Sequence, residues 1–467
     1  MRIPFWQWRH GGPVRRGLFY AMIEGGVVGG MFAAIEVWMV PLLQTRLGAA
    51  AFVIGLLTII PQIGMFALSP GIRAIIRRLG GAKQAAIRPG WIQVAALLLL
   101  LLPVHAQEAA WAVPFAVAMI CLIGLCFIVL GPAWVGWTSS LVPRSISGSY
   151  QARRMRLFNV TKLLFAGLFA WIAHVLPLDA GPWGISAILV VAAASRLASI
   201  GCLLRQPEMP ERPRLAPLSA RSAEAATGLG GFLRTMLRTD IGRWTLVWST
   251  FVGGVMVAGP FFASYMIATP AEGGLGLRDF DYTLLLYASV VARILFYPLV
   301  GRMVDLFGPR AVLRLSMTLI LLLPIAWALS SSLWILLLNE VVAGIAWAGA
   351  EVAIGALLFT AHADADRRAE LVGYFNTVAA ACIVAGTFIG TALIDLVPPI
   401  AGSRYHTIFL LSLALRLPGL YLALRWLPGL RPMRPSEGNS LVLTLPGVEM
   451  VSAFGRGLAT LFRRPID

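Results

Sequence analysis

Hydrophobic residues gather into long runs that short polar segments separate. Crossing the hydrocarbon core of a bilayer takes about 20 consecutive, mostly apolar residues in a helix. Twelve runs reach that length, and each predicts a membrane-spanning helix; they centre on Met31, Gly64, Leu97, Leu122, Phe169, Leu189, Val257, Ala292, Ile320, Gly344, Cys382 and Ala414. The pattern therefore predicts an all-α polytopic membrane protein with twelve transmembrane helices.

Short matches between the two halves of the chain indicate an internal duplication. The segment PGIRAIIRRLG at 70–80 aligns with PLVGRMVDLFG at 298–308. Further matches keep the same order in both halves: Gly25-Gly26 with Gly253-Gly254, Ala133-Trp134 with Ala346-Trp347, Phe158-Asn159 with Phe375-Asn376, and Arg196 with Arg416. We predict two pseudo-symmetric six-helix bundles, in residues 1–204 and 244–428.

Two polar regions lie outside these bundles. Residues 205–243 are charged and rich in proline, which predicts a cytoplasmic linker that cannot fold alone. Residues 429–467 form a tail with one apolar stripe at helical spacing, made of Val451, Phe454, Leu458, Leu461 and Phe462. A basic amphipathic helix on the membrane surface is one interpretation of the tail, and a disordered tail is the other.

Charge placement sets the topology. The 467 residues are 58% hydrophobic and 13% charged with a formal net charge of +17, and the mean hydropathy is +0.81. Of the 38 Lys and Arg residues, 31 fall on one side of the predicted membrane, and the opposite side holds only Arg46, Arg278 and Arg404. Cytoplasmic loops carry such an excess. Both termini are therefore predicted in the cytoplasm, and the positive charge requires no nucleic-acid partner.

One loop carries a recognisable motif. Within Tyr297–Arg310 the residues follow the pattern G-x-x-x-D-x-x-G-x-[RK], with Gly301, Asp305, Gly308 and Arg310. This pattern, between two membrane helices of a duplicated chain, resembles the signature of the major facilitator superfamily. The resemblance implies a transporter whose two halves rock about a central cavity, with this loop as a cytoplasmic gate.

The first half departs from that signature. Arg77 occupies the position of Asp305, and Arg73 that of Gly301. We therefore expect a one-sided latch in which Asp305 alone carries the anionic part. The fifth helix also lacks the glycine and proline signature of many drug/proton antiporters, so drug export does not follow from the resemblance.

Ionisable residues inside a bilayer are costly and mark candidate functional sites. They are Glu24 and Glu36 in the first predicted helix, Lys162 in the fifth, Arg293 in the eighth, and Glu340 and Glu351 in the tenth. The resemblance implies that the first, fourth, seventh and tenth helices line the central cavity. The resemblance therefore places four of them on the transport path, Glu24, Glu36, Glu340 and Glu351, as candidates for substrate binding or proton coupling. Arg293 is a further candidate through its expected acidic partner.

The tenth helix combines acids with an aromatic residue on one face. Glu340 and Glu351 lie about 20° apart around an ideal helix axis, with Gly344 and Trp347 on the same stripe. This face is suited to hold a substrate or a proton, although Glu340 near the outer headgroups is equally consistent with simple hydration. Arg293 is expected to pair with an acid of this helix, either as a fixed packing pair or as part of the substrate site.

The first helix carries two acids about 120° apart on an ideal helix, so they are not expected to face the same cavity. We predict Glu36 as the substrate-facing acid and Glu24 as the proton carrier. The glycines at 25, 26, 29 and 30 predict close helix packing. Trp134 and Trp347 are candidates for ligand contact, with helix packing as the alternative.

Enzymatic motifs are not found. The sequence has no Walker loop and no H-E-x-x-H, and its four cysteines fall inside predicted helices. We expect no cofactor, metal, disulfide or enzymatic activity. The combined prediction is a monomeric, proton-coupled transporter of a small organic solute in a bacterial inner membrane. The alternative is a membrane assembly or chaperone factor built on the same fold.

Overall fold

A computed structural model describes residues 12–49, 51–68, 71–143, 146–177, 181–207 and 228–427. The first half of the chain forms α1 (Pro13–Val27), α2 (Gly29–Ala33), η2 (Ala34–Trp38), α3 (Met39–Pro41), η3 (Leu42–Arg46), α4 (Ala51–Leu68), α5 (Ile72–Arg78), α6 (Ala82–Leu99), α7 (Leu101–His105), α8 (Ala112–Thr138), α9 (Ser147–Val175) and α10 (Trp183–Arg205). The second half, with the helix that precedes it, forms α12 (Gly228–Thr235), α13 (Asp240–Ala258), α14 (Phe261–Ile267), η6 (Pro270–Glu272), α15 (Asp279–Phe307), α16 (Pro309–Leu329), α17 (Leu333–Phe359), α18 (Ala365–Leu393) and α19 (Arg404–Trp426).

All twelve predicted centres lie within helices. Among the described residues, eleven helices are long and apolar enough to cross a membrane. The remaining predicted centre, Gly64, lies in α4, an 18-residue apolar helix with Pro61 in its interior. The prediction of an all-α, multi-pass membrane protein is confirmed.

The chain divides into two compact units. Unit 1 contains Met1–Pro143, Arg154–Thr235 and Leu358–Thr377, and unit 2 contains Arg144–Arg153, Met236–Leu357 and Val378–Asp467. The break after Thr235 falls within the predicted linker. The predicted halves do not anticipate that α9 begins in unit 2 and that α18 begins in unit 1.

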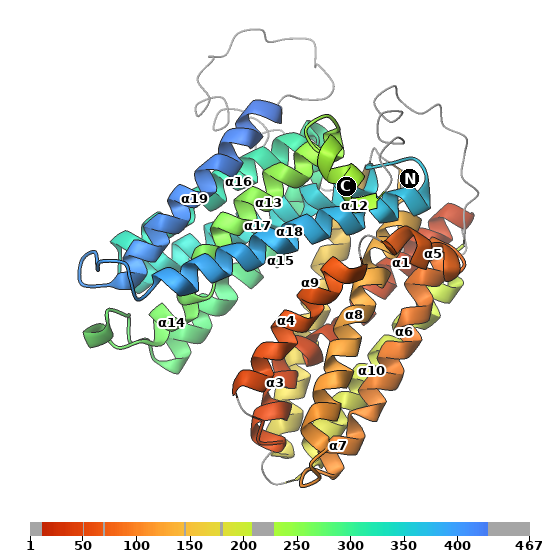
Figure 1. The fold of residues 1–467 in the computed structure, drawn as a ribbon, viewed down its shortest axis with the longest axis horizontal. Helices are drawn as coiled ribbons and strands as arrows, with labels where there is room; N and C mark the ends of the chain where they lie inside the picture. The colour runs from red at the N-terminus through yellow and green to blue at the C-terminus, as the bar shows by residue number, and fades with distance from the viewer. Residues whose placement is uncertain are drawn as a thin grey trace, which may run out of the picture. The chain divides into compact units, whose positions relative to one another are not determined.

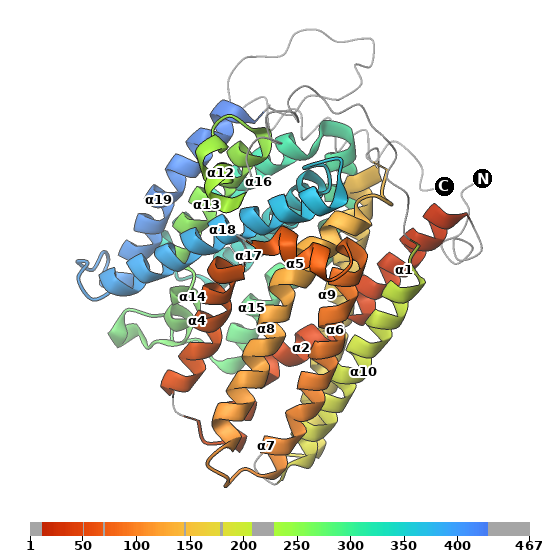
Figure 2. The ribbon, with the colours of Figure 1, turned by 45° about the vertical axis from the view of Figure 1, so that its right-hand side comes forward.

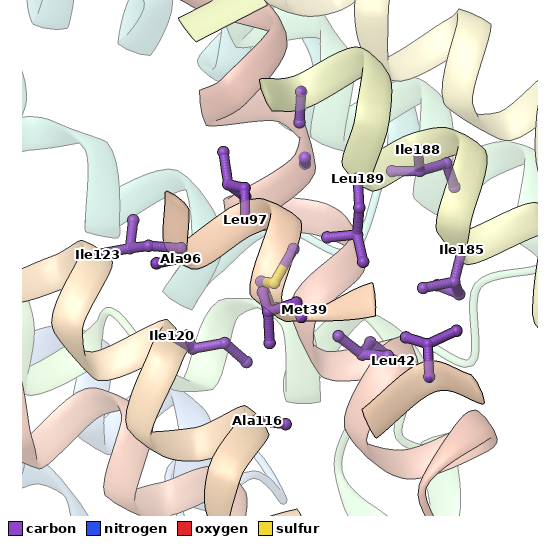
Figure 3. Close-up of a cluster of buried hydrophobic side chains, with 14 of the residues drawn as sticks. Met39, Leu42, Ala96, Leu97, Ala116, Ile120, Ile123, Ile185, Ile188 and Leu189 are labelled. Atoms are coloured by element: carbon purple, nitrogen blue, oxygen red, sulfur yellow. The ribbon is translucent and has the colours of Figure 1, made fainter. Parts of the chain in front are cut away.

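In unit 1, α6 packs against α8 and α10, and α1 packs against α10 (Figures 1 and 2). A large apolar core joins these helices to the second part of the first span. Figure 3 shows side chains of this core, among them Met39 and Leu42 of the first span, Leu97, Ile120 and Ile188. These side chains are almost fully buried, so this core holds the charged residues of the first span in place.

The first membrane span is interrupted rather than straight. A turn at Val28 separates α1 from α2, and η2 and η3 are π-helical segments. The hydroxyl of Thr161 donates to the Gly26 carbonyl at 2.7 Å, and that of Ser195 donates to the Val27 carbonyl at 2.6 Å. Side chains of neighbouring helices thus satisfy backbone groups at the break, as a membrane interior requires.

In unit 2, α13 packs closely against α19 and α18, and α16 also packs against α19 (Figure 1). Glycines make these approaches possible. A Cβ placed on Gly386 of α18 would lie 2.0 Å from the carbonyl oxygen of Gly253 of α13, and one on Gly254 would lie 2.5 Å from the carbonyl oxygen of Leu415. The repeated glycine pairs predicted from the sequence are therefore helix contacts.

Gly386→Ala is expected to lower the free energy of unfolding by about 1–3 kcal/mol, since the new methyl group meets backbone that cannot rotate away. Unfolding in mixed detergent and dodecyl sulfate micelles measures this change. Gly167→Ala is the matched control, because no atom lies within 4 Å of a Cβ at Gly167. Equal stability of the two variants would contradict close packing at Gly386.

Candidate functional site

A buried network of charged and hydroxyl groups connects three helices of unit 1. The guanidinium of Arg154 on α9 donates to Glu24 on α1 at 3.0 Å. The Ser199 hydroxyl on α10 donates to the other oxygen of Glu24 at 3.2 Å, and it accepts from Arg196 at 2.9 Å. Glu24 is 4% exposed and Arg196 is 1% exposed. One carboxylate thus serves the buried Arg196 and the partly buried Arg154.

Glycines make room for both guanidinium groups. A Cβ on Gly25 would lie 2.8 Å from Nε of Arg154, and a Cβ on Gly90 would lie 2.7 Å from Nη2 of Arg196. The glycine run of the first helix therefore makes room for the charged network in addition to the helix packing predicted for it.

A cavity of about 260–310 Å³ occurs in each unit, and the larger of the two adjoins this network. Glu24, Arg154, Arg196 and Trp134 line the unit 1 cavity together with apolar side chains. The Arg154 guanidinium carbon lies 3.9 Å from the Trp134 ring centroid, a close cation–π contact. Trp134, predicted as a ligand contact, is therefore covered on one face by an arginine.

Glu36 lies apart from this cavity lining. It belongs to the π-helical segment η2, and its carboxylate accepts from Nζ of Lys162 at 2.8 Å. The Glu36 side chain is 48% exposed and that of Lys162 is 28% exposed. The expected 120° separation of Glu24 and Glu36 assumed a continuous α-helix. The turn at Val28 and the π-helical segment mean that this ideal angle does not apply to the first span, but the two acids do not share a cavity, as expected, because the lining includes Glu24 and not Glu36. Both acids pair with bases of α9.

In unit 2 the ion pair expected for Arg293 is present. Arg293 of α15 donates to Glu351 of α17 at 2.8 Å, and the buried Tyr297 hydroxyl donates to the second oxygen of the same carboxylate. Gly344 permits this arrangement, because a Cβ there would lie 2.3 Å from the carbonyl oxygen of Ser289 on α15. The polar face predicted for the tenth helix is thus directed at α15.

The second cavity, of about 260 Å³, lies beside this pair. Arg293, Glu340, Trp347 and Arg416 contribute its polar and aromatic lining. Arg416 is almost fully buried and donates to the Ile320 carbonyl at 2.7 Å. Trp347 meets Trp248 edge to face, with ring centroids 6.2 Å apart. Glu340 therefore lines an intramembrane cavity.

The loop motif forms a helix cap. Both carboxylate oxygens of Asp305 accept backbone N–H groups at the start of α9, from Gly148 at 2.7 Å and Ser149 at 3.0 Å. A Cβ on Gly301 would lie 2.5 Å from Cβ of Ala152, so only glycine allows this approach. A carboxylate at a helix N-terminus is stabilised by two otherwise unpaired donors and by the helix dipole.

The other two motif residues shape the next helix. Gly308 has a φ of +85°, which favours glycine at the junction of α15 and α16. Arg310 donates to Asp240 of α13 at 2.8 Å, and its guanidinium carbon lies 4.8 Å from the Trp244 ring centroid. Each of the four motif residues therefore has an identifiable structural task.

The family model described as Major Facilitator Superfamily matches residues 250–465. The class B tetracycline resistance protein of Escherichia coli is 27% identical over 177 residues, which cover 36% of this chain and 41% of that protein. The matched region thus spans about two fifths of the length of this relative. Among solved structures, a bacterial homologue of the iron transporter ferroportin aligns with a TM-score of 0.67 at 16% identity, covering 88% of this chain and 98% of that one.

The Escherichia coli fucose:proton symporter aligns with a TM-score of 0.63 at 16% identity, covering 88% of this chain and 99% of that one. The second half of the chain thus matches the model of the major facilitator superfamily, and the fold is that of solved structures of the superfamily. Structural likeness at this identity establishes the superfamily's fold, and the roles of individual residues follow only from the contacts described above.

One contact departs from the superfamily signature in an unexpected way. Arg73, at the position of Gly301, lies 3.9 Å from Glu370 of α18, which also accepts from Arg367 and from the Tyr374 hydroxyl. The first half therefore also makes a contact, but with the charges exchanged: the acid is on α18, and the base is on α5. The prediction that Asp305 alone supplies the anionic part of the motif is not contradicted by this contact.

Several partners were not recognised in the sequence. Arg154 was counted among cytoplasmic bases because it follows the polar 144–153 segment, and Ser199, Tyr297 and Glu370 gave no signal without knowledge of the neighbouring helices. The four cysteines lie within helices, as predicted. The predicted amphipathic tail at 429–467 and most of the linker lie outside the described residues.

Proposed function

We propose that this superfamily member is a secondary active transporter that moves a small organic solute by alternating access and is coupled to protons. It resides in a bacterial inner membrane with both termini in the cytoplasm, as the distribution of Lys and Arg favours. The observation that carries the proposal is the Arg293–Glu351–Tyr297 cluster, an ion pair between membrane-spanning helices at the edge of a cavity.

The cluster supplies a mechanism for coupling. While Glu351 is ionised, it compensates the charge of Arg293. Protonation removes that compensation, and Arg293 then favours another anion, such as Glu340 on the same cavity wall or a charged substrate. A proton at Glu351 thereby changes the relative free energies of two arrangements of α15 and α17, which is the requirement for coupled transport.

The Asp305 cap supports the gate part of the proposal. It joins the start of α9, in the first half of the sequence, to the end of α15, in the second half. Rocking of the two halves must break contacts of this kind and form them again. We propose that Gly301, Asp305, Gly308 and Arg310 form one side of the cytoplasmic gate.

Glu351→Gln is expected to reduce substrate-driven proton movement at least about tenfold, because a neutral amide cannot exchange a proton. A thermal-shift screen of the purified protein first identifies a solute that binds. Proteoliposomes with an internal pH-sensitive dye then report proton movement when that solute is added.

Glu108→Gln is the control, since Glu108 is an exposed acid in the α7–α8 loop. Unchanged proton movement in Glu351→Gln, and again in Glu351→Gln combined with Glu24→Gln, contradicts coupling through these acids. Copurification of a protein partner without any stabilising solute favours the alternative, an assembly factor with the same fold.

A further inference from the structure

We propose that the unit 1 cavity binds an organic monoanion whose charged group meets Arg154 and Arg196 and whose body is apolar. If this anion is the transported substrate, the proposal rests on the proposed transport function. The existence of the anion site itself can be tested by binding alone, without transport.

The first reason is an imbalance of charge. Two guanidinium groups line the cavity, and arginine stays protonated in proteins. Glu24 is the single acid in the cavity lining, and it is shared by Arg154 directly and Arg196 through Ser199. A buried charge without compensation is costly. One additional negative charge would balance the site.

The second reason is the nature of the unsatisfied groups. Four buried nitrogen atoms of the cavity-lining side chains have no hydrogen-bond partner among the described residues: Nε of Arg154, Nε and Nη2 of Arg196, and Nε1 of Trp134. All four are donors, and no oxygen atom of the lining is unsatisfied in the same way. Buried polar groups normally have partners. The site therefore calls for acceptor atoms, as a carboxylate or sulfonate supplies.

The third reason is the apolar part of the lining. Phe32 lies between Phe127 and Phe158, with ring centroids 4.9 Å and 5.2 Å away. Val28 and Leu130 continue this surface. With a volume of about 310 Å³, the cavity is at the small end of ligand sites. A compact hydrophobic or aromatic acid matches both the volume and the lining.

The unit 2 cavity does not have the same imbalance. Its lining includes Arg293 and Arg416, but Glu351 pairs with Arg293 and Glu340 stands in the lining itself. Arg416 is the repeat counterpart of Arg196, whereas Val252 stands where Glu24 stands in the first half. The two units therefore differ chemically: unit 1 is suited to the anion, and unit 2 to the proton.

Three probes of one shape test the charge requirement: 2-naphthoate, its neutral amide 2-naphthamide, and the cation 2-naphthylmethylammonium. Binding to the detergent-purified full chain is measured by isothermal titration calorimetry. We expect the carboxylate to bind about tenfold or more tightly than the amide, since a charge-assisted contact is worth roughly 1.5–3 kcal/mol. The cation is expected not to bind measurably.

Variants then locate the site. Arg196→Gln should weaken 2-naphthoate binding about tenfold, whereas Arg196→Lys keeps the charge and should restore part of the affinity. Arg416→Gln is the control in unit 2 and should leave the affinity unchanged.

The outcomes separate this inference from the proposed function. Equal binding of all three probes, or a carboxylate affinity that Arg196→Gln leaves unchanged in a monodisperse protein, overturns the anion site. Selective, Arg196-dependent binding of the carboxylate supports the site even if no solute moves protons in proteoliposomes, in which case only the transport proposal fails.

Discussion

Glu24→Gln is expected to lower the free energy of unfolding by about 3–5 kcal/mol, the cost of leaving a buried ion-pair partner uncompensated. The carboxylate of Glu24 is 4% exposed and is the common partner of Arg154 and Ser199. Its removal leaves the buried Arg196 and the partly buried Arg154 without a counter-ion. Unfolding in mixed detergent and dodecyl sulfate micelles provides the measurement.

The same membrane span contains the matched control. Glu36 also pairs with a base of α9, but its side chain is 48% exposed. Exposed ion pairs contribute about 0–1 kcal/mol, so Glu36→Gln should change stability little. The double variant Glu24→Gln with Arg154→Gln should recover part of the loss, because it removes the acid and one base together. Similar losses in the free energy of unfolding for Glu24→Gln and Glu36→Gln would show that burial does not determine how much these ion pairs contribute to stability.

The contrast between these two acids shows what a sequence pattern can and cannot predict. Long apolar runs predicted the twelve helices, because a bilayer admits few alternatives to a helix of that length. The cost of an unpaired charge in the membrane also predicted an acidic partner for Arg293 on the tenth helix, and Glu351 is that partner. The ideal angle between Glu24 and Glu36 does not apply, because the first span is not a regular α-helix, but the expectation that the two acids do not share a cavity agrees with the lining, which includes only Glu24 of the two.

Contacts between distant segments were harder to predict than helices. Asp305 was recognised through a motif, and its role as a cap follows from its position at the start of α9. Glu370 belongs to no motif, and predicting its contact with Arg73 requires knowing that α18 begins beside α5, the short helix before α6. When the acid and the base of such a contact exchange places, no short pattern around either residue in a single sequence reveals the contact.

Asp305→Asn is expected to destabilise the contact between the loop and α9 by about 1–3 kcal/mol. The carboxylate accepts two backbone N–H groups, at 2.7 Å and 3.0 Å, whereas an amide retains one acceptor oxygen and carries no charge. A loss of about 2 kcal/mol corresponds to a change of about 30-fold in an equilibrium constant. The transporter should therefore shift away from its outward-open state.

Hydrogen–deuterium exchange distinguishes the cap from a general effect of charge. Loss of the cap frees the N–H groups of Gly148 and Ser149, so peptides from the start of α9 should exchange faster in Asp305→Asn. Arg77→Gln, at the repeat-equivalent position, removes a charge without removing a cap and should leave these peptides unchanged. Equal effects of the two substitutions would contradict the cap.

Arg73→Gln tests the contact whose charges are exchanged. The Arg73 side chain is 42% exposed and lies 3.9 Å from Glu370, which keeps Arg367 and Tyr374 as partners when Arg73 is replaced. Arg73→Gln should therefore lower the free energy of unfolding by less than about 1 kcal/mol. The Arg73 and Asp305 contacts then differ in strength as well as in the sign of the charge that each of these residues carries. Asp305 makes the stronger contact, because its oxygens meet backbone donors that have no other partner at the first turn of a helix.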